Sequence, residues 1–167
     1  QRCRDILQRL TRTPEAGDAV HERMSLLQVV QESIAPHARR PDVRVEAVVS
    51  GLHGEAAPEI WSLPEVLHAL TEFVENAVDF ATSRVEIPAE WDQRQVALTI
   101  ADDGPGFAPE IIDRIGEPYV TTREKSAAER DSDEVGGGLG LGFFIAKTLL
   151  KRSGARVACG NRKSPET

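Results

Sequence analysis

The glycine-rich segment at residues 136–142 constrains the fold of this chain more than any other part of its sequence. Its letters are GGGLGLG, five glycines in seven residues, and the stretch FFIAKTLLKRSG follows directly. Consecutive glycines expose backbone N–H groups, and a helix that begins there adds its own unpaired N–H groups. A plain turn would need only one or two glycines, so the segment predicts a phosphate site. It has neither the GK[ST] ending of a P-loop nor the βαβ surroundings of a dinucleotide-binding fold.

A second feature is the stretch LTEFVENAVDFA at residues 70–81. Read as a helix, it places Glu72, Asn76 and Asp79 on one face, because residues four and seven apart nearly superimpose. Its apolar residues fall on the opposite face, which predicts an amphipathic helix packed on a core. Periodicity alone favours an ordinary solvated face for the polar residues. The neighbouring glycine-rich segments favour the alternative, a face that binds a ligand.

A third feature is the segment DDGPG, which begins at Asp102 directly after the apolar stretch QVALTIA. A carboxylate at the end of a buried strand can accept a hydrogen bond from a purine amino group, and glycines let the backbone approach the ring. An ordinary Asp-Gly turn explains the same letters equally well. This segment alone therefore leaves both interpretations open.

The remaining patterns mix helices and strands without regular βαβ alternation, which predicts an α+β chain folded as a two-layer sandwich. The predicted helices are 26–38, capped by Ser25 with Gln28, 62–83, capped by Ser62 with Glu65, 110–115, and 140–153, ended by Gly154. The predicted strands are 43–50, 59–61, 84–91, 95–101 and 155–158. Residues 125–135 are polar and lack hydrophobic periodicity, which predicts a mobile segment.

Composition excludes several classes of protein. The formal net charge of −7 argues against nucleic acid or an anionic membrane as the main partner. No apolar run approaches the roughly 20 residues that a membrane span needs. The two cysteines, Cys3 and Cys159, lie far apart and outside any CxxC pair, so neither a disulfide framework nor a zinc site is indicated. We expect a reducing, cytoplasmic setting.

Taken in order, these segments resemble the ATP-binding core of the GHKL superfamily, which includes histidine kinases, gyrase-type ATPases and MutL. The stretch from Glu72 to Asn76 is similar to the N box, and Asp102 opens the G1 box. Residues 118–122, PYVTT, are similar to the F box, and residues 136–142 to the G2 box. The wording FVENAVDFA, EPYVTTRE and RCRDIL most resembles redox-responsive sensor histidine kinases of the RegB/PrrB type. The resemblance implies a Bergerat fold, a mixed sheet packed on three helices.

The resemblance also implies roles for individual residues. Asn76 would bind the Mg²⁺ that bridges the phosphates of ATP, Asp102 would accept from the adenine amino group, and residues 120–137 would form the ATP lid. The other residues implied in nucleotide binding are Asp79, Gly104, Gly106, Tyr119, Thr121, Thr122, Gly138, Leu139, Gly140, Leu141 and Gly142.

Two positions of the N box depart from the kinase pattern, and Tyr119 is the aromatic residue of the F box. The kinase N box usually has Asn in place of Glu72 and a basic residue in place of Asp79. An acidic residue at the first position is closer to the gyrase-like ATPases, in which it activates the hydrolytic water. Glu72 is therefore either a second metal ligand or a general base, and both interpretations stay open.

None of the four histidines, His21, His37, His53 and His68, lies in the H-E-L-R-like context of a phosphoacceptor. By resemblance, residues 1–18 would be the end of a dimerisation helix and a linker, and residues 19–167 the catalytic domain, with its final strand missing. The implied protein is the cytosolic part of an inner-membrane sensor kinase. It would transfer the γ-phosphoryl group of ATP to a histidine on its dimerisation domain, act as a homodimer and serve a response regulator.

Two alternatives to a kinase remain from the sequence, a GHKL ATPase that hydrolyses ATP to drive a conformational change and a nucleotide-binding module without turnover. Cys3 is also open: Arg2 and Arg4 beside it favour the reactive thiolate, and an inert helical cysteine fits equally well.

Overall fold

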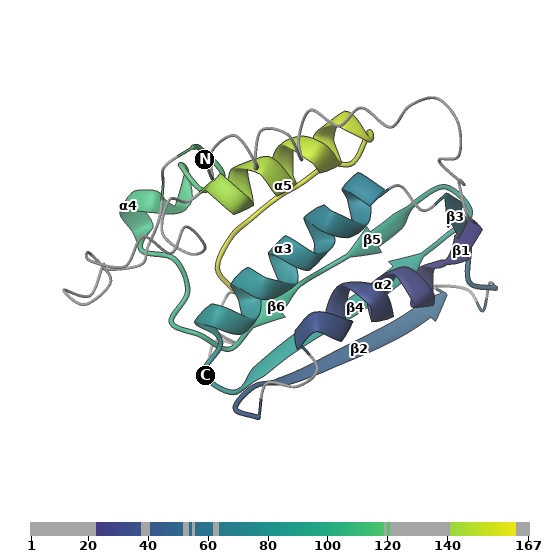
Figure 1. The fold of residues 1–167 in the computed structure, drawn as a ribbon, viewed down its shortest axis with the longest axis horizontal. Helices are drawn as coiled ribbons and strands as arrows, with labels where there is room; N and C mark the ends of the chain where they lie inside the picture. Colours follow the sequence, from purple (N-terminus) through teal and green to yellow (C-terminus); the bar gives the residue numbers. More distant parts are fainter. Residues whose placement is uncertain are drawn as a thin grey trace, which may run out of the picture.

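Two layers make up the fold, a mixed β-sheet and helices that lie on one of its faces (Figure 1). The computed structural model describes residues 23–37, 41–51, 54, 56–61, 64–118, 120 and 141–162. The elements within these residues are, in chain order, β1 (Arg23–Ser25), α2 (Leu26–Ile34), η1 (Ala35–His37), β2 (Arg44–Gly51), β3 (Glu59–Trp61), α3 (Pro64–Phe80), β4 (Arg84–Trp91), β5 (Val96–Leu98), β6 (Ala101–Asp102), α4 (Pro109–Ile112) and α5 (Leu141–Arg152).

Strand β4 lies at the centre of the larger sheet. On one side β2 runs parallel to it, and on the other side β5 and β6 pair with it in the antiparallel direction. Strands β1 and β3 form a separate two-stranded antiparallel sheet. Helices α2 and α3 cover one face of the larger sheet, and α5 packs beside α3 (Figure 1). This arrangement confirms the predicted α+β sandwich with a mixed sheet.

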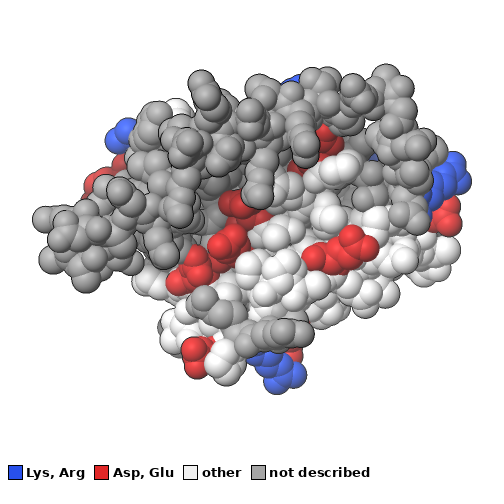
Figure 2. Space-filling view, viewed as in Figure 1, with Lys and Arg blue, Asp and Glu red and all other residues white. Residues whose placement is uncertain are grey.

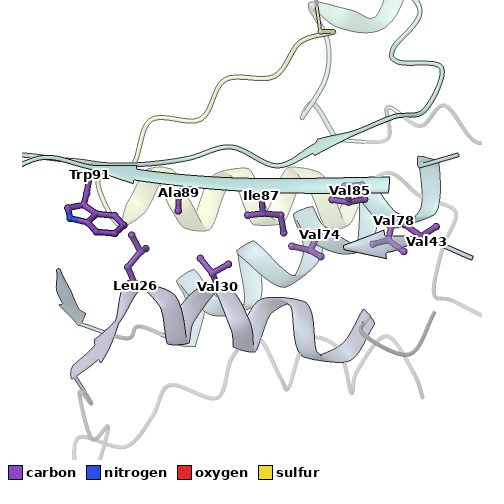
Figure 3. Packing of buried hydrophobic residues seen from close by; sticks show 10 residues of the cluster. Leu26, Val30, Val43, Val74, Val78, Val85, Ile87, Ala89 and Trp91 are labelled. Atoms are coloured by element: carbon purple, nitrogen blue, oxygen red, sulfur yellow. The ribbon is translucent and has the colours of Figure 1, made fainter. Parts of the chain in front are cut away.

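The hydrophobic core lies between the sheet and the two helices α2 and α3 (Figure 3). Alternate residues of β4 point into it, as the period of two in a strand requires, while their neighbours face outward. From the helices, residues three or four apart complete the cluster. The main buried side chains are Leu26 and Val30 of α2, Val74 and Val78 of α3, and Val85, Ile87, Ala89 and Trp91 of β4. Because each such side chain stabilises the fold by about 1.5–3 kcal/mol when fully buried, this cluster holds the polar face of α3 in a fixed orientation.

Two predicted helix boundaries are confirmed in atomic detail. The Ser25 hydroxyl accepts from the Gln28 N–H at 3.2 Å, and the Gln28 side chain accepts from the Ser25 N–H at 2.9 Å, which completes a capping box. At the end of α5, Gly154 has φ +89°, and its N–H donates to the Lys151 carbonyl at 3.1 Å. The next N–H, of Ala155, donates to the Leu150 carbonyl, so the helix ends in a Schellman motif.

The strand predicted at residues 95–101 is divided into β5 and β6. The register is the same on both sides of the gap, since Ala89 faces Leu98 and Glu86 faces Ala101. Between them, Thr99 donates its N–H to the Pro88 carbonyl at 3.0 Å. The return bond cannot form because proline has no N–H, so the antiparallel pairing is interrupted there.

Three other predicted boundaries were wrong. Helix α2 stops at Ile34 and continues only as the 3₁₀ turn η1, because Pro36 cannot donate to the helical hydrogen bonds. The helix predicted at 110–115 is the shorter α4. Residues 155–158 belong to no strand, and the segment that contains them is held by side-chain contacts described below. Among the helices that the structure describes, none is both long enough and apolar enough to cross a bilayer.

Candidate nucleotide-binding site

The polar face of α3 carries the residues of the predicted N box. Glu72 and Asn76 are half-buried and Asp79 is exposed. The Asn76 Nδ2 donates to the Glu72 carbonyl oxygen at 2.7 Å, so the helix backbone fixes the carboxamide. The group that this side chain can offer a ligand is therefore its Oδ1, an oxygen of the kind that Mg²⁺ binds. On the same side of the molecule, Figure 2 shows a band of acidic side chains between the positions of α3 and α5.

Glu72 reaches from α3 to the first turn of α5. A Cβ built on Gly142 would lie 2.5 Å from Glu72 Oε2, so the carboxylate rests against the backbone of this turn. Free N–H groups and the helix dipole favour negative charge there. Phe73 and Phe143 pack edge to face beside this contact, with ring centroids 4.7 Å apart. The structure thus brings the N box and the start of the helix after the glycine-rich segment together.

The DDGPG loop lies at the C-terminal end of α3. The Asp102 Oδ1 accepts from the Gly104 N–H at 2.9 Å, which closes a tight turn after β6. A Cβ on Gly104 would overlap the carbonyl oxygen of Phe80, the last residue of α3, and would lie 2.8 Å from Asp102 Oδ1. Only glycine lets the loop rest this closely on the helix end.

Asp103 fixes the start of this loop, a role that the sequence reading missed. Its Oδ1 accepts from the N–H groups of Thr82, Ser83 and Arg84 at 2.8, 2.9 and 3.0 Å, and its Oδ2 accepts from the Ser83 hydroxyl at 2.7 Å. The Ser83 N–H, followed by the other donors, holds the pKa of the Asp103 carboxyl well below its usual range. These bonds also explain why α3 ends at Phe80 and not near Ser83, as predicted: the amides that would extend the helix donate to Asp103 instead.

Asn161, also missed, fixes the end of the same loop. Its Oδ1 accepts from the Phe107 N–H and its Nδ2 donates to the Phe107 carbonyl, both at 2.7 Å. Gly106 has φ +75°, and a Cβ there would lie 2.8 Å from Asn161 Oδ1. The loop that begins with Asp102 is therefore held at both ends by side chains.

A third contact joins α5 to the turn before the predicted F box. The Lys147 Nζ donates to the Ile115 carbonyl at 2.9 Å. The lysine stem crosses Gly116, which has φ +83°, and a Cβ on this glycine would lie 2.5 Å from Lys147 Cδ. Helix α5, which begins within the glycine-rich segment, thus also fixes the chain just before the F box.

The predicted site residues that the structure describes form two groups, one beside the middle of α3 and one at its C-terminal end. Glu72 lies against Gly142 in the first turn of α5, and Asn76 follows it one turn later on the same face of α3. Asp102, Gly104 and Gly106 form the loop at the C-terminal end of α3, where Asp79 also lies. Outside the described residues are Tyr119, Thr121, Thr122, Gly138, Leu139 and Gly140, together with the predicted cap Ser62 and the segment 125–135 that the sequence predicts to be mobile.

No group of three or more His, Cys, Asp or Glu side chains in the described part of the chain could hold a metal ion by itself. The Asn76 oxygen and the Glu72 carboxylate suit a cation that takes few protein ligands. Mg²⁺ in nucleotide sites is of this kind, because it takes its other ligands from phosphates and water. The residues present therefore fit Mg²⁺ bound together with a phosphorylated ligand.

The amphipathic helix α3 covers a mixed sheet. A D-x-G-x-G loop lies at one end of this helix, and a glycine-rich helix start lies beside it. This combination defines an ATP-binding class of fold. Residues 63–167 match the family of histidine kinase-, DNA gyrase B- and HSP90-like ATPases, and the chain belongs to this family. Within it, the chain is similar to sensor histidine kinases.

The sensor histidine kinase RegB of Cereibacter sphaeroides is 44% identical over 98% of this chain, which spans 35% of the length of RegB. CpxA of Escherichia coli, also a sensor histidine kinase, is 34% identical over 57% of this chain and 20% of its own length. Among solved structures, the mycobacterial sensor histidine kinase MprB has a TM-score of 0.58 at 21% identity, over 81% of each chain. The ATP-binding domain of PrrB from Mycobacterium tuberculosis has a TM-score of 0.56 at 21% identity, over 81% of this chain and 82% of its own. The chain thus spans about a third of RegB, and the two structural likenesses support the fold.

Proposed function

We propose that this domain transfers the γ-phosphoryl group of Mg·ATP to a histidine on the dimerisation domain of the same sensor kinase. The observation that carries the proposal is the contact of Glu72, one turn before Asn76 on the same face of α3, with the first turn of α5. A triphosphate bound at that turn would lie beside the metal-binding oxygens of α3, which is the juxtaposition that phosphoryl transfer needs.

The chemistry asked of the protein is mainly positioning and charge neutralisation. Asn76 would hold the metal through Oδ1, since its Nδ2 is committed to the helix. When bound, Mg²⁺ supplies positive charge to the phosphate oxygens. Asp102 holds its Oδ1 in the turn with Gly104, so its second oxygen is the one that would accept from the adenine amino group. The N–H groups at the start of α5 would face the phosphates.

The proposed partners follow from the same assignment. Residues 1–18 would join the domain to a dimerisation helix that carries the acceptor histidine, and the working protein would be a homodimer. The phosphoryl group would pass from that histidine to a response regulator. We place the domain on the cytosolic side of an inner-membrane sensor.

ATP hydrolysis is a second candidate, and Glu72 supports it. Its carboxylate lies at the first turn of α5, close to where the terminal phosphate would sit, and a general base there would activate water. Loss of hydrolysis without loss of transfer in Glu72→Gln would assign the base role, whereas loss of both would assign a metal-binding role.

The test supplies a separate dimerisation domain and measures ATP affinity, phosphotransfer and phosphate release for the same set of variants. We expect Asp102→Asn to weaken ATP binding at least tenfold, because its amide nitrogen would face the adenine amino donor. The matched control is Asp113→Asn, an exposed carboxylate in the turn after α4, which should bind ATP like the wild type. Unchanged ATP affinity in Asp102→Asn would refute the adenine assignment, and failure of Asn76→Ala to reduce transfer would refute the metal assignment.

A further inference from the structure

The last described stretch of the chain, residues 155–162, makes no strand, yet it holds the loop that follows β6. The contact is made by the Asn161 carboxamide, which both accepts from and donates to the backbone of Phe107 at 2.7 Å. A carboxamide offers one acceptor and one donor side by side, as a peptide group does. Asn161 therefore pairs with Phe107 in the way that a residue of a neighbouring strand would.

The backbone of the loop is shaped around this contact. Gly106 has a positive φ, which disfavours other residues, and a Cβ there would lie 2.8 Å from Asn161 Oδ1. The fold itself therefore requires the second glycine of the D-x-G-x-G pattern. Gly106 leaves space for the side chain of Asn161, which lies 55 positions further along the chain. A larger residue at position 106 would displace the Asn161 side chain from this contact.

We propose that Asn161 is a positioning residue for the adenine-binding loop. Asp103 ties the start of the loop to the turn after α3, and Asn161 ties its end. With both ends fixed, the turn between Asp102 and Gly104 has one conformation, and the Asp102 carboxylate keeps one direction. This inference rests on the proposed function, since it concerns the same nucleotide site.

Arg162 provides an internal control for this role. It anchors the same segment through Glu86 of β4, with Arg162 Nη2 at 2.5 Å from Glu86 Oε2. Glu86 lies on β4. Within the described residues it has no hydrogen bond to the Phe107 backbone. Removing the Arg162 pair loosens the segment and leaves the Asn161 contact in place.

The experiment compares Asn161→Ala and Arg162→Met in the full chain. We measure Kd for ATP and ADP by calorimetry, and the hydrogen exchange rate of the Phe107 amide without nucleotide. We expect Asn161→Ala to raise Kd for both nucleotides by the same factor, about three- to tenfold, because a loop that serves adenine serves both. Exchange at Phe107 should become faster in Asn161→Ala only, and Arg162→Met should bind within about twofold of the wild type.

Phosphotransfer to a supplied dimerisation domain separates positioning from a general structural role. Asn161→Ala should raise KM for ATP and leave kcat near its original value. Equal losses in both variants would overturn the inference, because they would show that anchoring the segment is all that matters. Wild-type affinity in Asn161→Ala would also overturn it. A wild-type chain that binds neither nucleotide would instead overturn the proposed function.

Discussion

Gly104→Ala is the substitution that most directly tests how the nucleotide loop rests on the fold. The added Cβ would overlap the Phe80 carbonyl oxygen and lie 3.0 Å from the Phe80 carbonyl carbon. Both atoms belong to the backbone at the end of α3, so no side chain can rotate away. The loop or the helix end must move, and Asp102 moves with the loop because its Oδ1 is bonded to the Gly104 N–H.

The expected magnitude follows from the cost of forcing extra volume into a packed contact, about 1–3 kcal/mol. For a domain of this size, each kcal/mol lowers Tm by roughly 2–4 °C, so Gly104→Ala should lower Tm by roughly 2–12 °C. A displaced Asp102 would also lose its hydrogen bond to adenine, and we expect ATP affinity to fall at least tenfold.

The assay is thermal unfolding followed by circular dichroism, together with ATP titration of the folded protein. Gly160→Ala is the matched control, since a Cβ there meets nothing within 4 Å and its φ is not positive. Gly142→Ala gives a second comparison, because its Cβ would meet only the end of the Glu72 side chain, which can swing aside. We expect both to unfold within about 2 °C of the wild type. A Gly104→Ala protein that has the same Tm as Gly160→Ala and binds ATP with wild-type affinity would refute this account of the loop.

Three further predictions concern other contacts of the site. The lowered pKa of Asp103 means that its carboxylate stabilises the fold above the ordinary value of 3.8 and that this contribution is lost as the pH falls below it. Asp103→Asn should therefore show a flatter Tm profile than the wild type between about pH 5 and 2, and identical profiles would contradict the assignment. Lys147→Met keeps the stem over Gly116 but loses the bond to the Ile115 carbonyl. In urea unfolding, its free energy of unfolding should fall by about 1–3 kcal/mol. Lys151 is exposed, and Lys151→Met should change this free energy very little. With Glu72 as general base, Glu72→Gln should reduce ATP hydrolysis about a hundredfold or more and retain phosphotransfer, and equal losses of both activities would instead assign the metal-binding role.

Local patterns in the sequence were sufficient for most of the fold. The α3 pattern of apolar residues predicted the helix and its polar face, because the hydrophobic period follows directly from helix geometry. The capping box at Ser25 and the C′ glycine at Gly154 were equally local, since each involves residues within a few positions. Pro88 of β4 could have predicted the break between β5 and β6. The alternating apolar residues at 95–101 instead predicted one continuous strand.

The parts that were missed depend on contacts between distant segments. Asp103 shortens α3 by accepting hydrogen bonds from amides 19–21 positions earlier. No residue near Phe80 in the sequence predicts these bonds. Asn161 meets Phe107 across 54 positions, in a segment whose letters predicted only a strand. A second carboxylate next to Asp102 was the one available hint, and its role could be assigned only once the loop and the α3–β4 turn lay side by side.

The attachment of α5 has a consequence for engineering. Ile115 is bonded to Lys147 on this helix, and Leu141 begins the same helix, so the chain between them leaves from one rigid element and returns to it. The two ends of that span stay fixed by α5 whatever its length, and loop closure adds only about 0.6 kcal/mol for each doubling of the length. Spans of different length from other family members could therefore be joined to the same two attachment points.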